Sequence, residues 1–562
     1  MKVNGAKALI MSLIDNGIDT IFGIPGGVVI PIYDALYDFD NVKDILMRHE
    51  QGASHAADGF SRATGKLGCC FATSGPGATN IVTGLATAMM DSIPMLAITG
   101  QVKTTALGKD SFQEADISGI TMSVTKHNYL IKDVNDLPQI ISEACYLATT
   151  GRPGPVLVDI PMDISISEID YKPHDNKVEI RSYNPEKEID LNAVDEAVKL
   201  INETEKSVIY AGGGTITAGA SDILTKLAEK CNIHVTNTLM AKGIIDEHHN
   251  LSLGMLGMHG TAYANHAVHN CELLIAVGAR FDDRVTGKLS AFAKKAKVIH
   301  IDIDPAEIDK VIKADISIIG DAKKILEIIY EKVNKSTPST WDNHIHKWKE
   351  DYPLYLPNDK SMLYPQHVIN ALSEITDGKD YLTTDVGQNQ MWSALYYKVR
   401  KPRHFISSGG LGTMGFGLPS AIGVAFGTEK RVWAVCGDGG FQMTNQELAV
   451  CKEHKLPVKI ILLNNECLGM VHQWQDLFWD KRFSGTDLSS HPDYVKLAEA
   501  YGIKAVRVSK YEELYPALEE AYNYNKGTIL VEFMVCKENV FPMIPAGQSI
   551  EEMMVNRPKI KN

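Results

Sequence analysis

The sequence lacks the features that mark several special classes of protein. It has no run of about 20 uninterrupted apolar residues, and its first residues show neither the apolar core of a signal peptide nor the Arg- and Ser-rich pattern of a transit peptide. Only nine of its 562 residues are Cys, and these form no Cys-x-x-Cys pair and lie mostly in apolar segments such as 68–71. We therefore expect a cytoplasmic protein with reduced core cysteines, without a disulfide and without a zinc site.

Basic residues are also in deficit. The chain has 56 Lys and Arg against 69 Asp and Glu, a net charge of −13, so on average it repels a polymer coated with phosphate. Its 44% hydrophobic and 22% charged residues are typical of a globular protein and exclude disordered and collagen-like chains. We expect small-molecule ligands, and neither nucleic acid nor a membrane as a partner.

Short apolar segments alternate with helical patterns in three parts of the chain. This alternation predicts parallel strands joined by crossover helices, and therefore an α/β fold with three open, doubly wound domains. We place the domains at 1–165, 190–335 and 362–545, with a tail at 546–562 and polar connections at 166–190 and 334–359. The predicted strands are 21–23, 44–47, 69–73, 95–99, 156–160, 207–211, 273–277, 298–303, 381–384, 431–436, 459–464 and 528–534.

The sharpest motif is Gly437-Asp438-Gly439-Gly440, which Asn465 follows 27 residues after Asp438. Both parts lie at the carboxyl ends of predicted strands, where open α/β sheets bind their ligands. Mg²⁺ prefers oxygen ligands and is held by one or two side chains plus phosphates, so Asp438, the Asn465 amide oxygen and a nearby carbonyl would suffice. Gly-Asp-Gly alone is more often an ordinary turn, but the second motif favours a diphosphate site. Thr444-x-x-Glu447 then predicts a capping box at the start of the next helix.

Together these motifs resemble the signature of the thiamine-diphosphate enzymes, and the resemblance covers nearly the whole chain. It implies that Glu50, in the segment 48–53, touches the aminopyrimidine of the cofactor and shares a proton with it. Taken alone, Glu50 is as well explained by a favourable charge at a helix N-terminus.

Longer segments resemble the catalytic large subunits of the acetohydroxyacid (acetolactate) synthases. These segments are 22–27, 111–114, 125–129, 254–260, 282–287 and 468–474. The resemblance implies that Gly412 and Met414 flank the aminopyrimidine and that the Cys467 carbonyl completes the metal site. It implies further thiamine-diphosphate contacts at Val386, Gly387, Gln388, Asn389, Gly437, Gly439, Gly440, Leu468, Gly469 and Met470. The family usually has His where this chain has Asn389, which puts one phosphate contact in question.

Members of this family are transferases that move a two-carbon unit from pyruvate to a second 2-oxo acid. By the same resemblance, Gln113 and the Gly27 backbone would make polar contacts near the reacting oxygens. Trp474 would form a wall of the second-substrate pocket and favour 2-oxobutanoate over pyruvate, although an ordinary buried aromatic is the alternative. The implied substrate contacts are Phe112, Met470, Val471 and Trp474.

The central part of the chain offers a weaker signal. The Gly-Gly-Gly turn at 212–214 follows a predicted strand but does not have the Gly-x-Gly-x-x-Gly spacing. The resemblance implies that FAD binds here. It assigns FAD contacts to Arg152, Gly212, Gly213, Gly214, His259, Gly278, Ala279, Arg280, Arg284, Asp302 and Asp321. One departure is Met162, which stands where the family generally has Lys.

We therefore expect an acetolactate synthase that makes 2-acetolactate and 2-aceto-2-hydroxybutanoate, the first common step of branched-chain amino acid biosynthesis. Its cofactors would be thiamine diphosphate, Mg²⁺ and FAD. Glu50 and Asp438 fall in different domains and, in this family, on different subunits, which implies a homodimer or homotetramer; a small regulatory subunit is a further partner that the resemblance allows. The alternatives are a flavin-free catabolic synthase, which Met162 supports, a pyruvate oxidase, and a catalytically silent binding protein.

Overall fold

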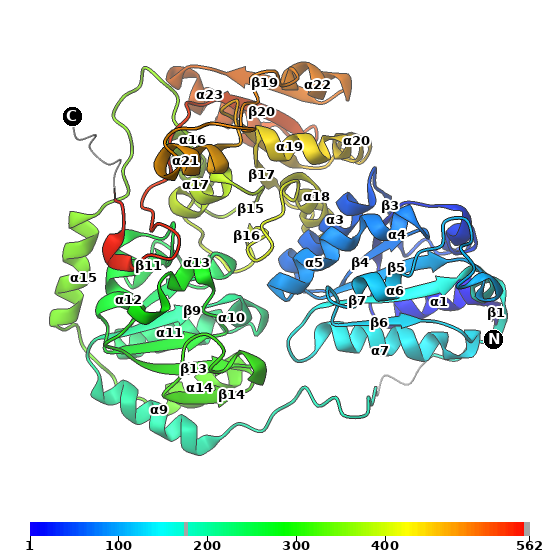
Figure 1. The fold of residues 1–562 in the computed structure, drawn as a ribbon, viewed down its shortest axis with the longest axis horizontal. Helices are drawn as coiled ribbons and strands as arrows, with labels where there is room; N and C mark the ends of the chain where they lie inside the picture. Colours follow the sequence, from blue (N-terminus) through cyan, green and yellow to red (C-terminus); the bar gives the residue numbers. More distant parts are fainter. Residues whose placement is uncertain (174–177, 556–562) are drawn as a thin grey trace.

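Three parallel sheets of six strands each, with helices packed on both faces, organise the molecule (Figure 1). The computed structural model describes residues 1–173 and 178–555. Figure 1 shows the first sheet at one end of the molecule and the other two beside each other at the opposite end. The predicted fold class is confirmed, while the domain boundaries themselves stay a prediction.

The first sheet has the strand order β3-β2-β4-β5-β7-β6, and each pair is parallel. Its strands are β2 (Thr20–Gly23), β3 (Lys43–Leu46), β4 (Gly68–Ala72), β5 (Met95–Gln101), β6 (His127–Leu130) and β7 (Pro155–Pro161). Its helices are α1 (Gly5–Asp15), α2 (Ile30–Leu36), α3 (Glu50–Thr64), α4 (Pro76–Asn80), α5 (Val82–Asp91), α6 (Ile117–Thr121), α7 (Leu137–Thr149) and α8 (Met162–Ile166).

The central sheet has the order β11-β10-β9-β12-β13-β14 and is also parallel. Its strands are β9 (Ser207–Ala211), β10 (His234–Asn237), β11 (Ser252–Met255), β12 (Leu273–Val277), β13 (Lys297–Asp302) and β14 (Ile316–Ile319). The helices are α9 (Leu191–Glu203), α10 (Gly213–Thr217), α11 (Ser221–Cys231), α12 (Ala262–Asn270), α13 (Asp283–Thr286) and α14 (Ala322–Lys332).

The third sheet has the order β16-β15-β17-β18-β20-β19. Its strands are β15 (Tyr381–Thr384), β16 (Phe405–Ile406), β17 (Val432–Gly437), β18 (Val458–Asn464), β19 (Lys504–Val508) and β20 (Ile529–Met534). Its helices are α16 (Pro365–Thr376), α17 (Gln388–Tyr396), α18 (Gly417–Thr428), α19 (Asp438–Thr444), α20 (Leu448–Glu453), α21 (Gly469–Phe478), α22 (Tyr494–Ala500) and α23 (Leu514–Asn523).

Two segments that the sequence indicates as irregular contain regular structure. Strand β8 (Glu168–Asp170) pairs antiparallel with β1 (Lys2–Asn4) at the outer end of the first unit. Helix α15 (Thr340–Asp351) lies in the second predicted connection and begins with a capping box formed by Ser339 and Asp342. Both polar connections therefore contain a short element that the sequence pattern does not predict.

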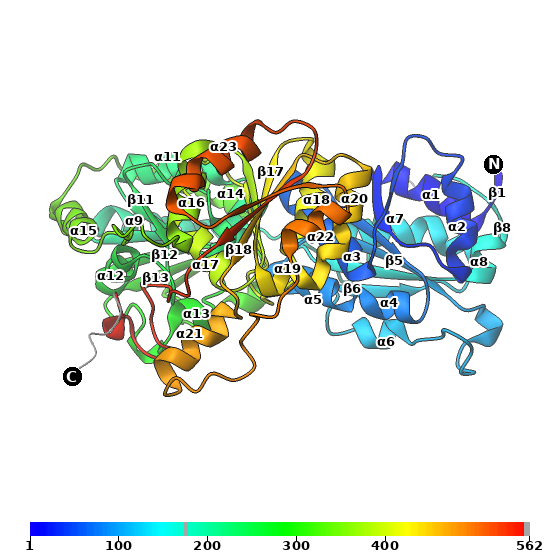
Figure 2. The same cartoon turned by 90° about the horizontal axis from the view of Figure 1, so that it is seen from above.

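The first and third units share one hydrophobic core across helices α3 and α18, which Figure 2 shows next to each other. A Cβ on Gly59 would collide with the Ser420 backbone, and one on Gly423 would collide with the Ala56 backbone. The two helices approach this closely only because both positions are Gly.

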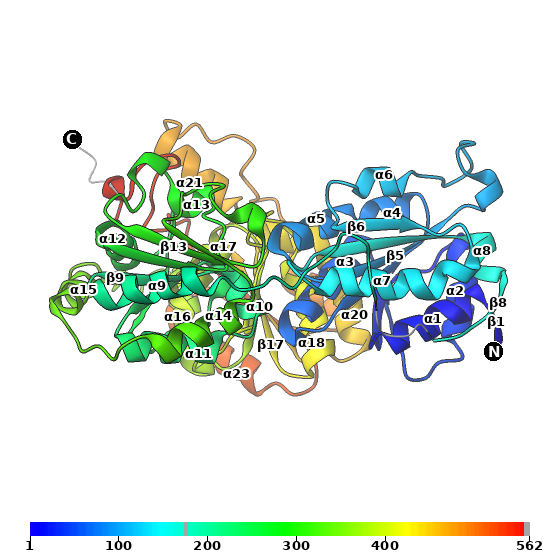
Figure 3. The same cartoon turned by 90° about the horizontal axis from the view of Figure 1, so that it is seen from below.

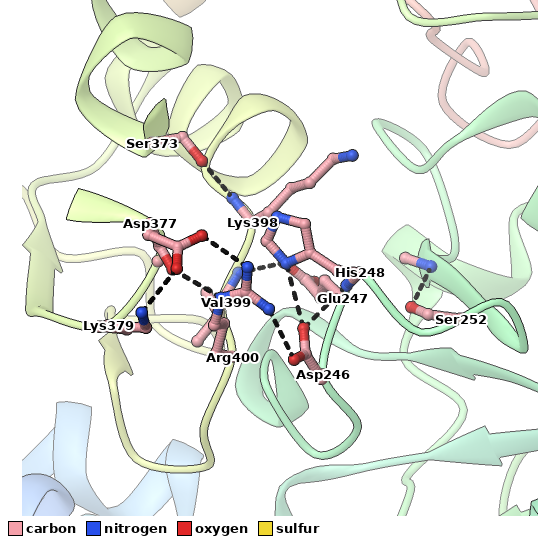
Figure 4. A network of polar contacts seen from close by, with 12 residues as sticks. Asp246, Glu247, His248, Ser252, Ser373, Asp377, Lys379, Lys398, Val399 and Arg400 are labelled. Carbon is pink, nitrogen blue, oxygen red and sulfur yellow. Dashed lines mark hydrogen bonds and ion pairs between the residues drawn. The ribbon is translucent and has the colours of Figure 1, made fainter. Parts of the chain in front are cut away.

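The central and third units are joined by a network of polar contacts (Figure 4). Arg400 donates to Asp246 at 3.0 Å and to Asp377 at 2.5 Å, and Val399 donates its backbone N–H to Glu247 at 2.8 Å. The buried Lys242 ammonium donates to the same Glu247 carboxylate at 2.6 Å. These contacts fix the two sheets that border the cavity described below.

The nine cysteines are free thiols, and all except the half-buried Cys536 are buried. Among the described helices, none combines the length and apolar character needed to cross a bilayer.

Candidate active site

Asp438 lies where β17 ends and α19 begins, at the carboxyl edge of the third sheet. Its side chain is almost fully buried, and one carboxylate oxygen accepts the Gly439 N–H at 2.9 Å. The other oxygen, Oδ2, is buried and has no partner among the described residues. Burial raises the pKa of this carboxyl to about 6. A buried carboxylate oxygen without a partner is suited to a cation.

The segments after β15, β17 and β18 lie together at the carboxyl edge of the third sheet, around Asp438. Gln388 and Asn465 lie 3.4 Å apart through their side-chain amides, and a Cβ on Gly437 would lie 3.1 Å from Asn389 Nδ2. Asn389 Oδ1 is buried without a partner in the described structure. The predicted residues Val386, Gly387, Gly412, Met414, Gly439, Gly440, Cys467, Leu468 and Gly469 lie in these segments or in the loop that precedes α18.

Asp385 orders this region and was missed from the sequence. Its buried carboxylate accepts the backbone N–H groups of Val386, Gly415 and Gly417 at 2.8 to 3.2 Å, and burial raises its pKa to about 6. It therefore joins the segment of Gln388 to the loop of Met414. The available signal was an acidic residue directly after a predicted strand and two residues before a Gly.

The predicted capping box at Thr444 and Glu447 is wrong. Helix α19 already begins at Asp438, and the Thr444 hydroxyl donates to the Gly415 carbonyl at 3.0 Å. Glu447 instead accepts the backbone N–H of Arg48, in the first unit, at 3.2 Å. Burial raises the pKa of the Glu447 carboxyl to about 7.

Glu50 is the first residue of α3, and its carboxylate accepts from the Asn80 amide at 2.9 Å. A Cβ on Gly77 would lie 3.2 Å from Glu50 Oε1, and a Cβ on Gly75 would lie 2.9 Å from the Gln113 carbonyl. Glu50 and Gln113 therefore border the start of α4 from two sides. Gly27 begins a short 3₁₀ turn and has open space around its Cα, and Phe112 is 88% exposed.

The structure thus forms two groups of predicted residues within one chain. The first surrounds Glu50 on the first sheet, and the second surrounds Asp438 on the third sheet. In the described part of the chain, the Glu50 carboxylate hydrogen-bonds Asn80, not the loop of Asp438.

A cavity of about 1180 Å³ lies among the three units and is large compared with typical ligand pockets. Every predicted FAD contact lines it: Arg152, Gly212, Gly213, Gly214, His259, Gly278, Ala279, Arg280, Arg284, Asp302 and Asp321. The connecting segment 178–187, which Figure 3 shows between the first unit and α9, lines it as well.

Several buried polar groups face this cavity without a partner among the described residues. Both ring nitrogens of His259 are of this kind, and burial lowers the pKa of this imidazole to about 4. The Tyr210 hydroxyl and Thr238 Oγ1 are also buried and unpaired, and both residues line the cavity. Such groups cost free energy unless a ligand satisfies them. They fit a large polar cofactor such as a flavin nucleotide.

Arg152 and Asp302 have surroundings that the sequence did not indicate. Arg152 donates to Glu307 at 2.6 Å and to Asp304 at 3.1 Å, so its charge is already paired with carboxylates. Burial raises the pKa of Asp302, at the end of β13, to about 6. Asp321 caps α14 by accepting the Lys324 N–H at 2.9 Å.

One end of the cavity reaches the third unit. Met470 and Trp474 on α21 line it together with Gly412, and the Arg284 guanidinium lies 5.8 Å from the centre of the Trp474 ring. Trp474 Nε1 is buried without a partner in the described structure, whereas the neighbouring Val471 is 51% exposed. The predicted FAD contacts and Gly412 therefore line one space.

Comparison with known proteins assigns all three units. Residues 3–120 match the family described as thiamine pyrophosphate enzyme, N-terminal TPP binding domain; residues 194–329 match its central domain, and 385–533 its C-terminal TPP binding domain. The chain is 47% identical over 560 residues to an acetolactate synthase large subunit of Corynebacterium glutamicum, covering 98% of this chain and 89% of that protein. It is 48% identical over 571 residues to an acetolactate synthase of Mycobacterium bovis (99% and 92% covered) and 46% identical over 563 residues to a large subunit of Porphyra purpurea (98% and 95%).

Proposed function

The chain belongs to the thiamine pyrophosphate enzymes, among the acetolactate synthase large subunits, and from this membership we infer that it is a thiamine-diphosphate-dependent acetolactate synthase of branched-chain amino acid biosynthesis. Within the structure, the observation that best supports cofactor binding is the unpaired Asp438 oxygen at the carboxyl end of β17, inside the segment that matches the C-terminal TPP binding domain. A diphosphate with its cation would satisfy this oxygen.

In this proposal the third unit holds the diphosphate end of the cofactor. Asp438, the Asn465 amide oxygen and the Cys467 carbonyl are the Mg²⁺ ligands, and the amide of Asn389 takes the place that His has in the family. Asn389 Nδ2, which donates to the Val386 carbonyl at 3.2 Å, is the donor that this side chain offers to a phosphate oxygen. Asp385 keeps the two loops around the site in register through their backbone N–H groups.

Glu50 is the proposed proton-exchanging residue. Thiamine diphosphate, when bound, supplies the carbon nucleophile and the electron sink for pyruvate decarboxylation. The Glu50 carboxyl shares a proton with the aminopyrimidine, and Asn80 holds this carboxyl in place through its 2.9 Å hydrogen bond. Gln113 and the Gly27 backbone lie on the same edge of the first sheet and would orient the reacting oxygens.

FAD is the proposed occupant of the large cavity. The size of the cavity, its glycine-lined strand ends at Gly212 and Gly278, and the unpaired nitrogens of His259 support this assignment over the flavin-free alternative. Met162 begins α8 and is not among the described residues that line the cavity, so its difference from the family leaves these contacts intact. Two-carbon transfer requires no change in flavin redox state.

The second substrate is pyruvate or 2-oxobutanoate, with Trp474 as an apolar wall for the additional methyl group. The separation of the Glu50 group from the Asp438 group supports a homodimer, in which each site takes its first-unit residues from one copy and its third-unit residues from the other. A small regulatory subunit is a further proposed partner.

One assay tests the function. Purified protein with pyruvate, thiamine diphosphate and Mg²⁺ is expected to form acetolactate with little acetate and without oxygen uptake. Acetate formed with oxygen uptake would instead identify a pyruvate oxidase. The protein is also expected to carry FAD after purification, and full activity of colourless, exhaustively dialysed protein would assign it to the flavin-free synthases.

A further inference from the structure

A buried ion-pair network connects the first unit to the loop at 407–416 in the third unit. Arg62 in α3 lies between the carboxylates of Asp58 and Asp91, and these side chains are 5%, 0% and 0% exposed. A buried ion pair adds little net stability because desolvation offsets its attraction. The main effect of this network is therefore to fix the positions of the groups that it contacts, and not to raise the stability of the fold.

Asp91, the last residue of α5, contacts the loop directly. Its Oδ1 accepts the Gly410 N–H at 2.7 Å, and its Oδ2 accepts the Gly409 N–H at 3.0 Å and an Arg62 N–H at 2.9 Å. Arg62 also donates to the Ser407 carbonyl at 2.9 Å. Carbonyl and amide groups at the start of the loop are thus bound to one charged pair from the first unit.

The loop can approach Asp91 this closely only because residue 410 is Gly. A Cβ at this position would lie 2.9 Å from Asp91 Oδ1 and 3.0 Å from Met90 Cβ. Such distances would force the loop away from α5.

A second contact one helical turn earlier on α5 holds the far end of the loop. The hydroxyls of Thr87 and Thr413 are hydrogen-bonded at 2.7 Å in a buried position. Thr87 and Asp91 are four residues apart and therefore share a face of α5. Leu411 and Gly412 lie between these two contacts and, like Gly409 and Gly410, line the large cavity.

We propose that Asp91, with Arg62, is a positioning residue that holds the loop from Ser407 to Met414 against α5 and so places Gly412 and Met414 for the cofactor. The role of Gly412 and Met414 toward thiamine diphosphate rests on the proposed function, whereas the attachment of the loop to α5 does not. The first unit of a chain thereby positions the loop of the third unit that flanks the aminopyrimidine in the same chain.

The first test needs no cofactor. In Asp91→Asn an NH₂ group replaces one carboxylate oxygen, so it cannot accept from both glycine amides. Asp58→Asn is the matched control, because it removes the other carboxylate of Arg62 without touching the loop. We expect amide hydrogen exchange of the peptide covering 407–414 to be about tenfold or more faster in Asp91→Asn than in Asp58→Asn, as for the loss of one charge-assisted hydrogen bond. Equal exchange in the two variants would overturn the proposal.

The second test measures cofactor binding by calorimetric titration of the complete protein with thiamine diphosphate in the presence of Mg²⁺. Asp91→Asn and Gly410→Ala, which moves the loop while keeping the charge, are both expected to raise the half-saturating concentration about tenfold or more. Asp58→Asn should change the half-saturating concentration of thiamine diphosphate much less. A uniform loss of thermal stability in all three variants with unchanged cofactor affinity would contradict positioning. Wild-type protein that neither binds the cofactor nor makes acetolactate would refute the proposed function. It would not refute the attachment of the loop to α5, which the exchange experiment tests without the cofactor.

Discussion

Several residues of the candidate site carry single polar atoms that are buried without a partner. Asp438 Oδ2, Asn389 Oδ1, the His259 nitrogens and Trp474 Nε1 are of this kind among the described residues. Asp438 was predicted from the spacing of its motif, and Asn389, His259 and Trp474 from resemblance to the family. That their polar atoms are buried without a partner could not be predicted, because this is a property of the folded chain. Asp385 and Glu307 were missed for the same reason, since their partners are distant in sequence.

The carboxyl of Glu50 gives the first prediction. Glu50→Gln should keep the fold and lower acetolactate formation by roughly 10²- to 10⁴-fold, because an amide cannot exchange a proton with the aminopyrimidine. Steady-state rates at saturating cofactor measure this effect. Asp222→Asn is the control, since Asp222 also lies in the first turn of a helix, α11, and tests whether the charge serves only the helix terminus. Equal rates in both variants would leave Glu50 with a structural role.

Trp474 gives the second prediction. Trp474→Leu should lower the preference for 2-oxobutanoate over pyruvate by roughly 1–3 kcal/mol, about ten- to two-hundredfold in product ratio, because the additional methyl loses its apolar wall. Pyruvate turnover should persist. Competing both acceptors in one reaction and measuring both products tests this directly. A loss of both products in the same proportion would show that Trp474 is only part of the core.

At the scale of helices and strands, the sequence predicts most inner strands of each sheet, but it does not predict several short or partly exposed strands. Strands such as 207–211 and 273–277 coincide with β9 and β12, since a buried parallel strand is a nearly continuous apolar run. The short β16 and the partly exposed β6 and β19 lack this signal. The capping box failed because local spacing cannot reveal that Glu447 binds the backbone of another unit.

Glu447, which accepts the Arg48 N–H just before α3, gives the third prediction. Because burial raises its pKa from 4.5 to about 7 in the folded protein, its contribution to stability is present at low pH and is lost as the pH rises through this range. The amide in Glu447→Gln does not titrate. The difference in melting temperature, variant minus wild type, should therefore be larger at pH 8 than at pH 5. We expect a difference of several degrees, at roughly 2–4 °C per kcal/mol. Glu453→Gln, which removes an exposed carboxylate that pairs with Arg48, should show no such difference.

At the scale of the whole molecule, the three units divide the chemistry among them. The first unit carries Glu50, the central unit carries most of the large cavity, and the third unit carries Asp438. Buried contacts join the units through α3 and α18, through Asp91 and the loop of Met414, and through Glu247 and Val399. The sequence could indicate three α/β units by their alternating pattern, but not these contacts, which depend on residues hundreds of positions apart.

The assignment of each site to two copies of the chain gives the last prediction. Glu50→Gln and Asp438→Ala are each expected to be inactive alone. In a mixed dimer, the intact Glu50 of one copy meets the intact Asp438 of the other, so one of the two sites is complete. If equal amounts of the variants are unfolded and refolded together, half of the dimers are mixed, and activity should recover to about a quarter of the wild-type value. Refolding each variant separately before mixing is the control. Should both residues instead serve a site within one chain, no mixed dimer would contain a complete site, and the mixture would stay as inactive as its components.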